Sequence, residues 1–229
     1  MKKLFISMGI ACLLAVPVAT SAQEVSTKDL MKQRKELRQA SKADLNEKAS
    51  KAAKKEAKKL QKEGWQTAPG ALPLEKQLDK SYLMQMEFDE SMYPKYMMGE
   101  AMSIGENYDG AKMQAVELAK QNLAAQIQTE VSALVDNSVA TQQLAMEEAV
   151  TVTKSIMASK SLIVQSIGRT ITVVECYRTL KNKNKEVLVR IAYNGEMAKL
   201  AAKNAIRQSL ENESDELHKK LDNVLGTNK

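Results

Sequence analysis

The sequence predicts an α+β protein: a small antiparallel sheet with helices packed on one face, preceded by a long basic helical arm. The chain has 229 residues, of which 44% are hydrophobic, and this is enough for one core with extensions. Over residues 94–212 the hydrophobic periodicity predicts elements in the order strand, helix, helix, strand, strand, helix, which is typical of this class. Residues 23–63 lack proline and glycine and are rich in Ala, Lys, Glu and Gln, so they predict a helix.

The first 22 residues have the pattern of a secretory signal peptide. Two lysines precede an apolar run over 4–18, and small residues ending at Ala22 follow it. The run is shorter than a membrane span requires, so we expect cleavage after Ala22 and no transmembrane segment afterwards. Lipidation of Cys12 is an alternative, although its flanking sequence lacks a complete lipobox. Export predicts a periplasmic, outer-membrane-associated or secreted protein.

The basic excess of the mature chain lies in residues 23–63. This segment holds 13 Lys and Arg against 7 Asp and Glu, whereas residues 64–229 hold 19 against 21. Its apolar positions form a thin stripe, so we expect an exposed helical arm, with a weak coiled-coil dimer or a membrane-surface helix as alternatives. The predicted partner-binding residues are six lysines of its second half: Lys51, Lys54, Lys55, Lys58, Lys59 and Lys62.

A basic arm on an exported chain predicts an acidic partner. We expect an envelope protein, or an anionic polymer or lipid surface of the envelope, because a basic surface attracts polyanions at long range. Nucleic acid is excluded as a partner outside the cytoplasm. A homo-oligomer formed through the arm or through pairing of sheet edges stays open as an alternative.

Residues 64–93 are predicted to form a Pro/Gly linker followed by a short helix. Gly64 ends the arm, and the residues after it are rich in Pro and Gly. The lone Trp65 is expected to dock the arm onto the globular part of the molecule. The following helix is expected over 74–93, because Pro94 would end it.

The predicted domain over 94–212 begins with a strand over 95–105 that glycine interrupts. A long amphipathic helix follows, capped by Asp109 and reaching about residue 136, with apolar residues every three or four positions. A second helix is expected over 141–160, although its Val and Thr residues are β-branched. The domain is expected to stay folded when residues 23–63 are removed.

The second half of the domain predicts a hairpin and a closing helix. Strands over 170–180 and 186–193 flank a polar turn. Alternating Val, Ile and Tyr in the second strand indicate that one of its faces is buried. Asn194 and Gly195 then open a helix, and residues 213–229 are expected to form a C-terminal helix or tail.

The strand and helix at the start of this domain resemble a known family. The residues that carry the resemblance are Gly99-Glu100-Ala101-Met102 and the helical run from Ala111 to Ile127, rich in Ala and Leu. They are similar to the small bacterial envelope lipoproteins typified by the twenty-kilodalton membrane-associated lipoprotein, and to the amino-terminal domain of flagellar assembly protein T. The resemblance covers about residues 95–200 and implies an envelope protein without catalytic residues. Stretches 62–65 and 69–78 also look like those of exported proteins of anaerobic gut-type bacteria.

Seven methionines between positions 84 and 113 raise the alternative of periplasmic copper handling, because thioethers bind Cu(I). They are Met84, Met86, Met92, Met97, Met98, Met102 and Met113. Methionine is also a flexible core filler, and this chain has only 2 Phe and 1 Trp. The methionines are therefore interpreted as structural.

Few other residues are suited to chemistry, and an unrecognised hydrolase is kept only as an alternative. The carboxylate pairs Asp89-Glu90 and Glu147-Glu148 are adjacent on helices and therefore point apart. Cys176 is expected to be a buried, inert thiol and His218 a solvated surface residue. The glycines at 99, 105 and 110 lack a phosphate-binding spacing and are expected to mark a bulge and turns. The sequence thus predicts a noncatalytic binding or assembly protein with no metal and no cofactor.

Overall fold

The computed structural model of the chain contains two compact units, Met1–Lys48 and Ala49–Lys229. The structure describes residues 31–32, 35–36, 39, 48–89, 94–211 and 215–226. The predicted signal peptide and the alternative lipidation site therefore lie outside the described residues, as does most of the predicted arm before residue 48. The fold described below is that of the second unit.

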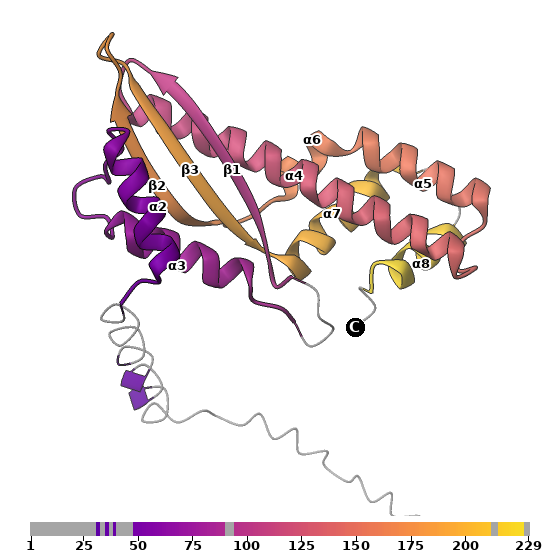
Figure 1. Cartoon of the computed structure of the whole chain (residues 1–229). Helices are drawn as coiled ribbons and strands as arrows, with labels where there is room; N and C mark the ends of the chain where they lie inside the picture. The colour runs from indigo at the N-terminus through magenta and orange to yellow at the C-terminus, as the bar shows by residue number, and fades with distance from the viewer. Residues whose placement is uncertain are drawn as a thin grey trace, which may run out of the picture. The chain divides into compact units, whose positions relative to one another are not determined.

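The second unit has the predicted α+β architecture, with an antiparallel sheet of three described strands (Figure 1). The strands are β1 (Tyr96–Gly105), β2 (Ile171–Thr179) and β3 (Lys185–Asn194). The described helices are α2 (Lys51–Lys62), α3 (Leu74–Gln85), α4 (Tyr108–Ala140), α5 (Met146–Ala158), α6 (Lys160–Ser166), α7 (Gly195–Ser209) and α8 (Asp215–Val224).

The central strand of the sheet is β3, and the strand order is β1-β3-β2. Tyr96 lies opposite Asn194 and Gly105 opposite Lys185, with an unbroken register between them. β2 pairs with the other side of β3 and has one irregularity, just after Thr172. Because alternate side chains of a strand point to opposite faces, β3 presents its residues to two separate layers.

One face of the sheet is covered by α4. Val187, Val189 and Ile191 of β3 are fully buried against this helix, as the alternating pattern predicted. At Gly99 of β1 a Cβ atom would overlap the carbonyl oxygen of Ala119 in α4. The sequence interpretation of Gly99 as a bulge is therefore wrong, because the glycine permits close approach of helix and strand within a regular register.

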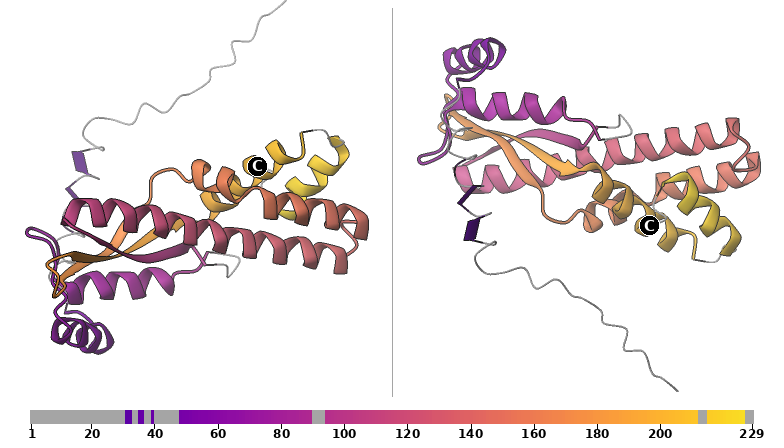
Figure 2. Two further views of the ribbon diagram at one scale, coloured as in Figure 1. Left: turned by 90° about the horizontal axis from the view of Figure 1, so that it is seen from above. Right: turned by 90° about the horizontal axis from the view of Figure 1, so that it is seen from below.

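The opposite face of the sheet is covered by α3, with α2 packed beside it, so that the sheet lies between α3 and α4 (Figure 2). The cluster on this face consists of Ala49, Ala53, Ala57, Trp65, Leu74, Leu78, Val174 and Cys176. The prediction that helices cover one face needs correction in this respect. Residues 49–85 belong to the domain because their apolar side chains bury the second face of β2 and β3.

The second half of α4 extends past the sheet and packs with α5, α6, α7 and α8 (Figure 1). The helix has 33 residues, which corresponds to a length of about 50 Å. Leu217 and Leu221 of α8 are buried in the main core, and Lys220 Nζ lies 2.7 Å from Glu148 Oε1 of α5. The C-terminal helix is thus part of the same core as the rest of the domain.

Several predicted helix boundaries differ in the structure. The helix α4 runs to Ala140 and not to residue 136, and the next predicted helix is divided into α5 and α6. The cap of α4 is Asn107 in place of Asp109, and its side chain accepts a hydrogen bond from the Gly110 N–H at 2.8 Å. The helix predicted over 141–160 begins only at Met146, because Gln142 takes a left-handed conformation with φ 58° and interrupts it. The helix after the linker ends at Gln85, well before the predicted residue 93.

Candidate functional site

The predicted partner-binding lysines lie on α2, and Ser50 fixes the start of this helix. The Ser50 hydroxyl accepts a hydrogen bond from the Ala53 N–H at 3.2 Å, which is a typical N-cap. The Ser50 N–H donates to Asp79 Oδ1 of α3 at 2.9 Å. Hydrogen bonds from Ser50 hold the pKa of Asp79 below its usual value, so this link between α2 and α3 persists in mildly acidic solution.

A row of alanines docks α2 onto the rest of the domain. Ala53 and Ala57 are buried one turn apart on the same side of the helix, and Ala49 is buried just before the N-cap. Over residues 49–63 the chain is therefore not the exposed arm that the sequence predicted. The alanine stripe is thin, but its small side chains let α2 approach α3 closely, and α3 supplies the larger apolar residues of the cluster.

Trp65 completes the docking just beyond the end of α2, as predicted. Gly64 turns the chain with φ 89°, and the Trp65 side chain is only 4% exposed. The guanidinium group of Arg178 in β2 lies 4.8 Å from the centroid of the Trp65 ring, and Arg178 also donates to the Glu63 carbonyl at 3.4 Å. The end of α2 is thereby fixed against β2.

This docking places the six lysines on the outward half of α2, which we call the lysine face. Five of the six side chains are exposed, and Lys54 is half-buried. None of them forms an ion pair with any residue that the structure describes. The helix has 12 residues, with six lysines and one glutamate. The lysine face is therefore a concentration of positive charge on a docked helix, without an ion pair to any described residue.

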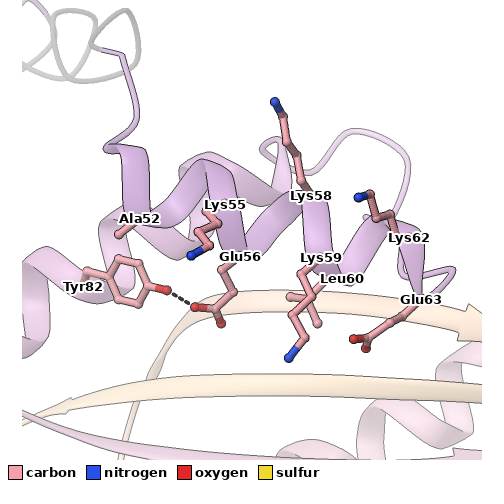
Figure 3. Close-up of a pocket in the computed structure, with 9 residues that line it drawn as sticks. All are labelled: Ala52, Lys55, Glu56, Lys58, Lys59, Leu60, Lys62, Glu63 and Tyr82. Carbon is pink, nitrogen blue, oxygen red and sulfur yellow. Dashed lines mark hydrogen bonds between the residues drawn. The ribbon is translucent and has the colours of Figure 1, made fainter.

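A shallow groove of about 730 Å³ runs along one side of the lysine face (Figure 3). Lys51 and Lys54 do not line it, whereas the other four predicted lysines do. Lys58 points away from the strands and Lys59 points toward them (Figure 3). The lining residues are Ala52, Lys55, Glu56, Lys58, Lys59, Leu60, Lys62, Glu63 and Tyr82.

Within the groove, Tyr82 of α3 donates a hydrogen bond to the carboxylate of Glu56 (Figure 3). Burial, and then the contact with Glu56, raise the pKa of Tyr82 to about 12, so the hydroxyl stays protonated at neutral pH. Glu56 is the one acidic residue within α2. Because its carboxylate is held by Tyr82, it does not pair with the neighbouring lysines.

A second basic element, which was not predicted from the sequence, lies near the lysine face. The turn between β2 and β3 carries Lys181 and Lys183, which are both exposed and form no ion pair with a described residue. Both figures of the whole fold place this turn at the same end of the domain as α2 (Figures 1 and 2). The available signal was the alternation of Lys and Asn over 181–185, which was interpreted only as a turn.

The structure brings only two of the described methionines together: Met84 and Met98 pack in one apolar cluster with Val173 and Ala192. Met97 and Met98 are neighbours on β1 and point to opposite faces, where each packs in a different apolar cluster. Met98 and Met102 are four residues apart on a strand, a separation of about 13 Å. At the end of α3, Met84 is buried and Met86 is exposed. Met92 lies outside the described residues.

The other described residues considered for catalysis are buried or half-buried, paired with a lysine, or exposed. Cys176 is fully buried, as predicted, and burial raises its thiol pKa to about 12. His218 is half-buried with its Nδ1 shielded from solvent, so the prediction of a solvated residue is wrong; the docking of α8 covers it. Glu148 pairs with Lys220, while Glu147 is exposed. Of the pair at 89–90, the second residue lies outside the described part of the chain.

The described residues contain no group of three or more His, Cys, Asp and Glu side chains arranged to hold a metal ion. No helix among them has both the length and the hydrophobicity needed to cross a bilayer.

Comparisons of the chain with models of protein families, with curated proteins and with solved structures gave no match. The resemblance to the small envelope lipoproteins therefore stays a prediction from the sequence.

Proposed function

We propose that this is an exported, noncatalytic protein of the bacterial envelope that binds an acidic partner through the lysine face of α2. The observation that carries the proposal is a docked helix whose six lysines have no ion-pair partner among the described residues. The pattern of residues 1–22 supports export. Such a cluster attracts polyanions, and its fixed backbone lowers the entropy lost on binding.

The test is the binding of the mature protein to anionic probes. Two probes are used: inorganic polyphosphate, and phosphatidylcholine vesicles that contain phosphatidylglycerol. The variant replaces three solvent-facing lysines with glutamine: Lys55, Lys58 and Lys62. One lysine near an anionic surface contributes about 1 kcal/mol, so we expect the triple variant to bind about 100-fold more weakly. Binding by the unaltered protein should also weaken with added salt.

A matched control removes the same charge from a distant part of the domain. Lys154, Lys160 and Lys219 are exposed on α5, α6 and α8, so their replacement by glutamine changes the net charge equally. The control should bind as the unaltered protein does. The proposal is overturned when the α2 variant binds as tightly as the control, or when neither probe binds at low salt.

A further inference from the structure

The lysine face continues beyond α2 on a segment more than a hundred residues later in the sequence. Lys181 and Lys183 lie in the turn of the β2–β3 hairpin, which is closed by a hydrogen bond from the Leu180 N–H to the Asn184 carbonyl at 2.9 Å. Both side chains are exposed. The turn is thus an ordered element that presents two positive charges.

Arg178 connects this turn to the end of α2. Its Nε lies 2.5 Å from Glu186 Oε2 on the opposite strand of the hairpin, and its NH1 donates to the carbonyl of Glu63. The same guanidinium group stacks over Trp65. Because Arg178 contacts both strands of the hairpin and the residue that follows α2, the turn and the helix end are held near each other (Figure 1).

From this arrangement we infer that the lysine face and the β2–β3 turn form one elongated surface for a linear anionic polymer. The inference rests on the proposed function and extends it. The row from Lys51 to Lys62 runs along the helix axis for about 16 Å, and the turn adds further charge beyond the end of the helix. A flexible chain of regularly spaced anionic groups contacts such a row along its whole length.

A bilayer fits this surface less well than a polymer does. Helices that lie in a membrane surface bury Trp, Phe or Leu in the lipid. Ala49, just before α2, and Ala53 and Ala57 within it are already buried in the domain. Leu60 is half-buried against the same cluster, and the outward half carries lysines with Ala52 and Gln61. No large apolar side chain of the lysine face is therefore free to enter lipid.

The experiment compares two variants of the mature protein on three probes. One variant is the α2 triple variant described above, and the other is Lys181→Gln with Lys183→Gln. The double variant Lys154→Gln with Lys160→Gln is its control of equal charge. The probes are long-chain polyphosphate, tripolyphosphate and phosphatidylglycerol-containing vesicles. For each combination, affinity is measured as a function of salt concentration.

Long-chain polyphosphate should bind the turn variant about 30-fold more weakly, at the same contribution per lysine as on α2, while the affinity of the control is unchanged. Loss of two phosphate contacts should also lower the slope of log affinity against log salt by about 1.4. Tripolyphosphate is short enough to bind on α2 alone, so the substitutions in the turn should not change its affinity.

Three outcomes would contradict these expectations. When the α2 variant weakens binding but the turn variant does not, the extended surface is refuted and the proposed function stands. Tighter binding to vesicles than to long-chain polyphosphate overturns the choice of a polymer. When the α2 variant has no effect, the proposed function itself fails.

Discussion

Gly99 shows how one residue sets the distance between α4 and the sheet. A Cβ at this position would overlap the Ala119 carbonyl oxygen and lie 2.9 Å from the Cβ of Leu123. Both groups belong to α4, so relief would require movement of the helix away from β1. A glycine within a strand signals either a bulge or close approach of another backbone, and the sequence alone does not separate the two.

We expect Gly99→Ala to destabilise the domain by about 1–3 kcal/mol, because the added methyl group overpacks a fixed contact. Gly168→Ala is the matched control, since its Cβ would have no atom within 4 Å and its φ is not left-handed. Chemical denaturation of both variants measures the difference. Equal stability of the Gly99→Ala and Gly168→Ala variants would show that the contact between α4 and β1 at Gly99 has room for a methyl group.

The sequence predicted the charged residues of the candidate site better than their setting. The lysines were evident from charge alone, but the docking of α2 was not, because Ala53 and Ala57 provide a weak hydrophobic signal. The burial of these alanines depends on Leu78 and Val174, which are distant in sequence. Lys181 and Lys183 join the site through tertiary structure, which no local pattern records.

Among the elements, those with a strong local period were predicted correctly. All three strands and the helix α7 were found, because alternation and an Asn N-cap are local signals. The second covered face of the sheet was not predicted. On that face of β3 a charged residue, Arg190, stands between Leu188 and Ala192, so the hydrophobic pattern is interrupted. Arg190 forms an ion pair with Glu100 of β1 at 2.5 Å. A buried face that includes an ion pair looks solvent-exposed in a hydrophobicity pattern.

The attachment of α8 should depend on pH through Glu148. The Lys220 ammonium group and the Ala145 N–H lower the pKa of Glu148 below 4.5 in the folded protein. A carboxylate with a depressed folded pKa contributes stability above its unfolded pKa and loses it as the pH falls. We therefore expect amide protection in α8 to decrease below about pH 4.5, as measured by hydrogen exchange.

Two variants separate this effect from general acid unfolding. Glu148→Gln should lower the protection of α8 at neutral pH and remove the part of the pH dependence that Glu148 causes. Glu147→Gln is the control, because Glu147 is exposed on the same turn of α5. If amide protection of α8 depended on pH in Glu148→Gln as it does in the unaltered protein, Glu148 would not be the cause. Other ion pairs, such as those of Asp222 with Lys203 and Arg207, would then account for the attachment of α8.

At the scale of the whole molecule, the boundary of the folded domain lies earlier than the sequence predicted. The second compact unit begins at Ala49, and α3, with α2 beside it, covers the second face of the sheet over β2 and β3. The lysine face is therefore carried by the domain, and its position relative to the β2–β3 turn is fixed by packing. This makes binding and stability separable, because the lysines point outward while the alanines of the same helix hold it in place.

Two truncations of the mature chain test this boundary. A chain that begins at Ala49 should keep the melting temperature of the full mature protein, because the three apolar clusters described in the domain are formed by residues from 49 onward. A chain that begins at Gly64 loses α2 and uncovers part of the apolar cluster that includes Trp65, Val174 and Cys176. Exposure of these side chains costs roughly 3–5 kcal/mol, which should lower the melting temperature by about 10 °C.

Thiol reactivity gives a second readout of the same truncations. Cys176 should react slowly with a thiol reagent at pH 8 in the chain from Ala49, because burial raises its pKa to about 12. In the chain from Gly64 the thiol loses part of this cover, so it should react at least tenfold faster. If the two truncated chains had equal melting temperatures and equal reaction rates, α2 would not be part of the folded domain, and the prediction of an exposed arm would be correct. Unequal values would place the start of the functional domain at the alanine stripe that anchors the lysine face.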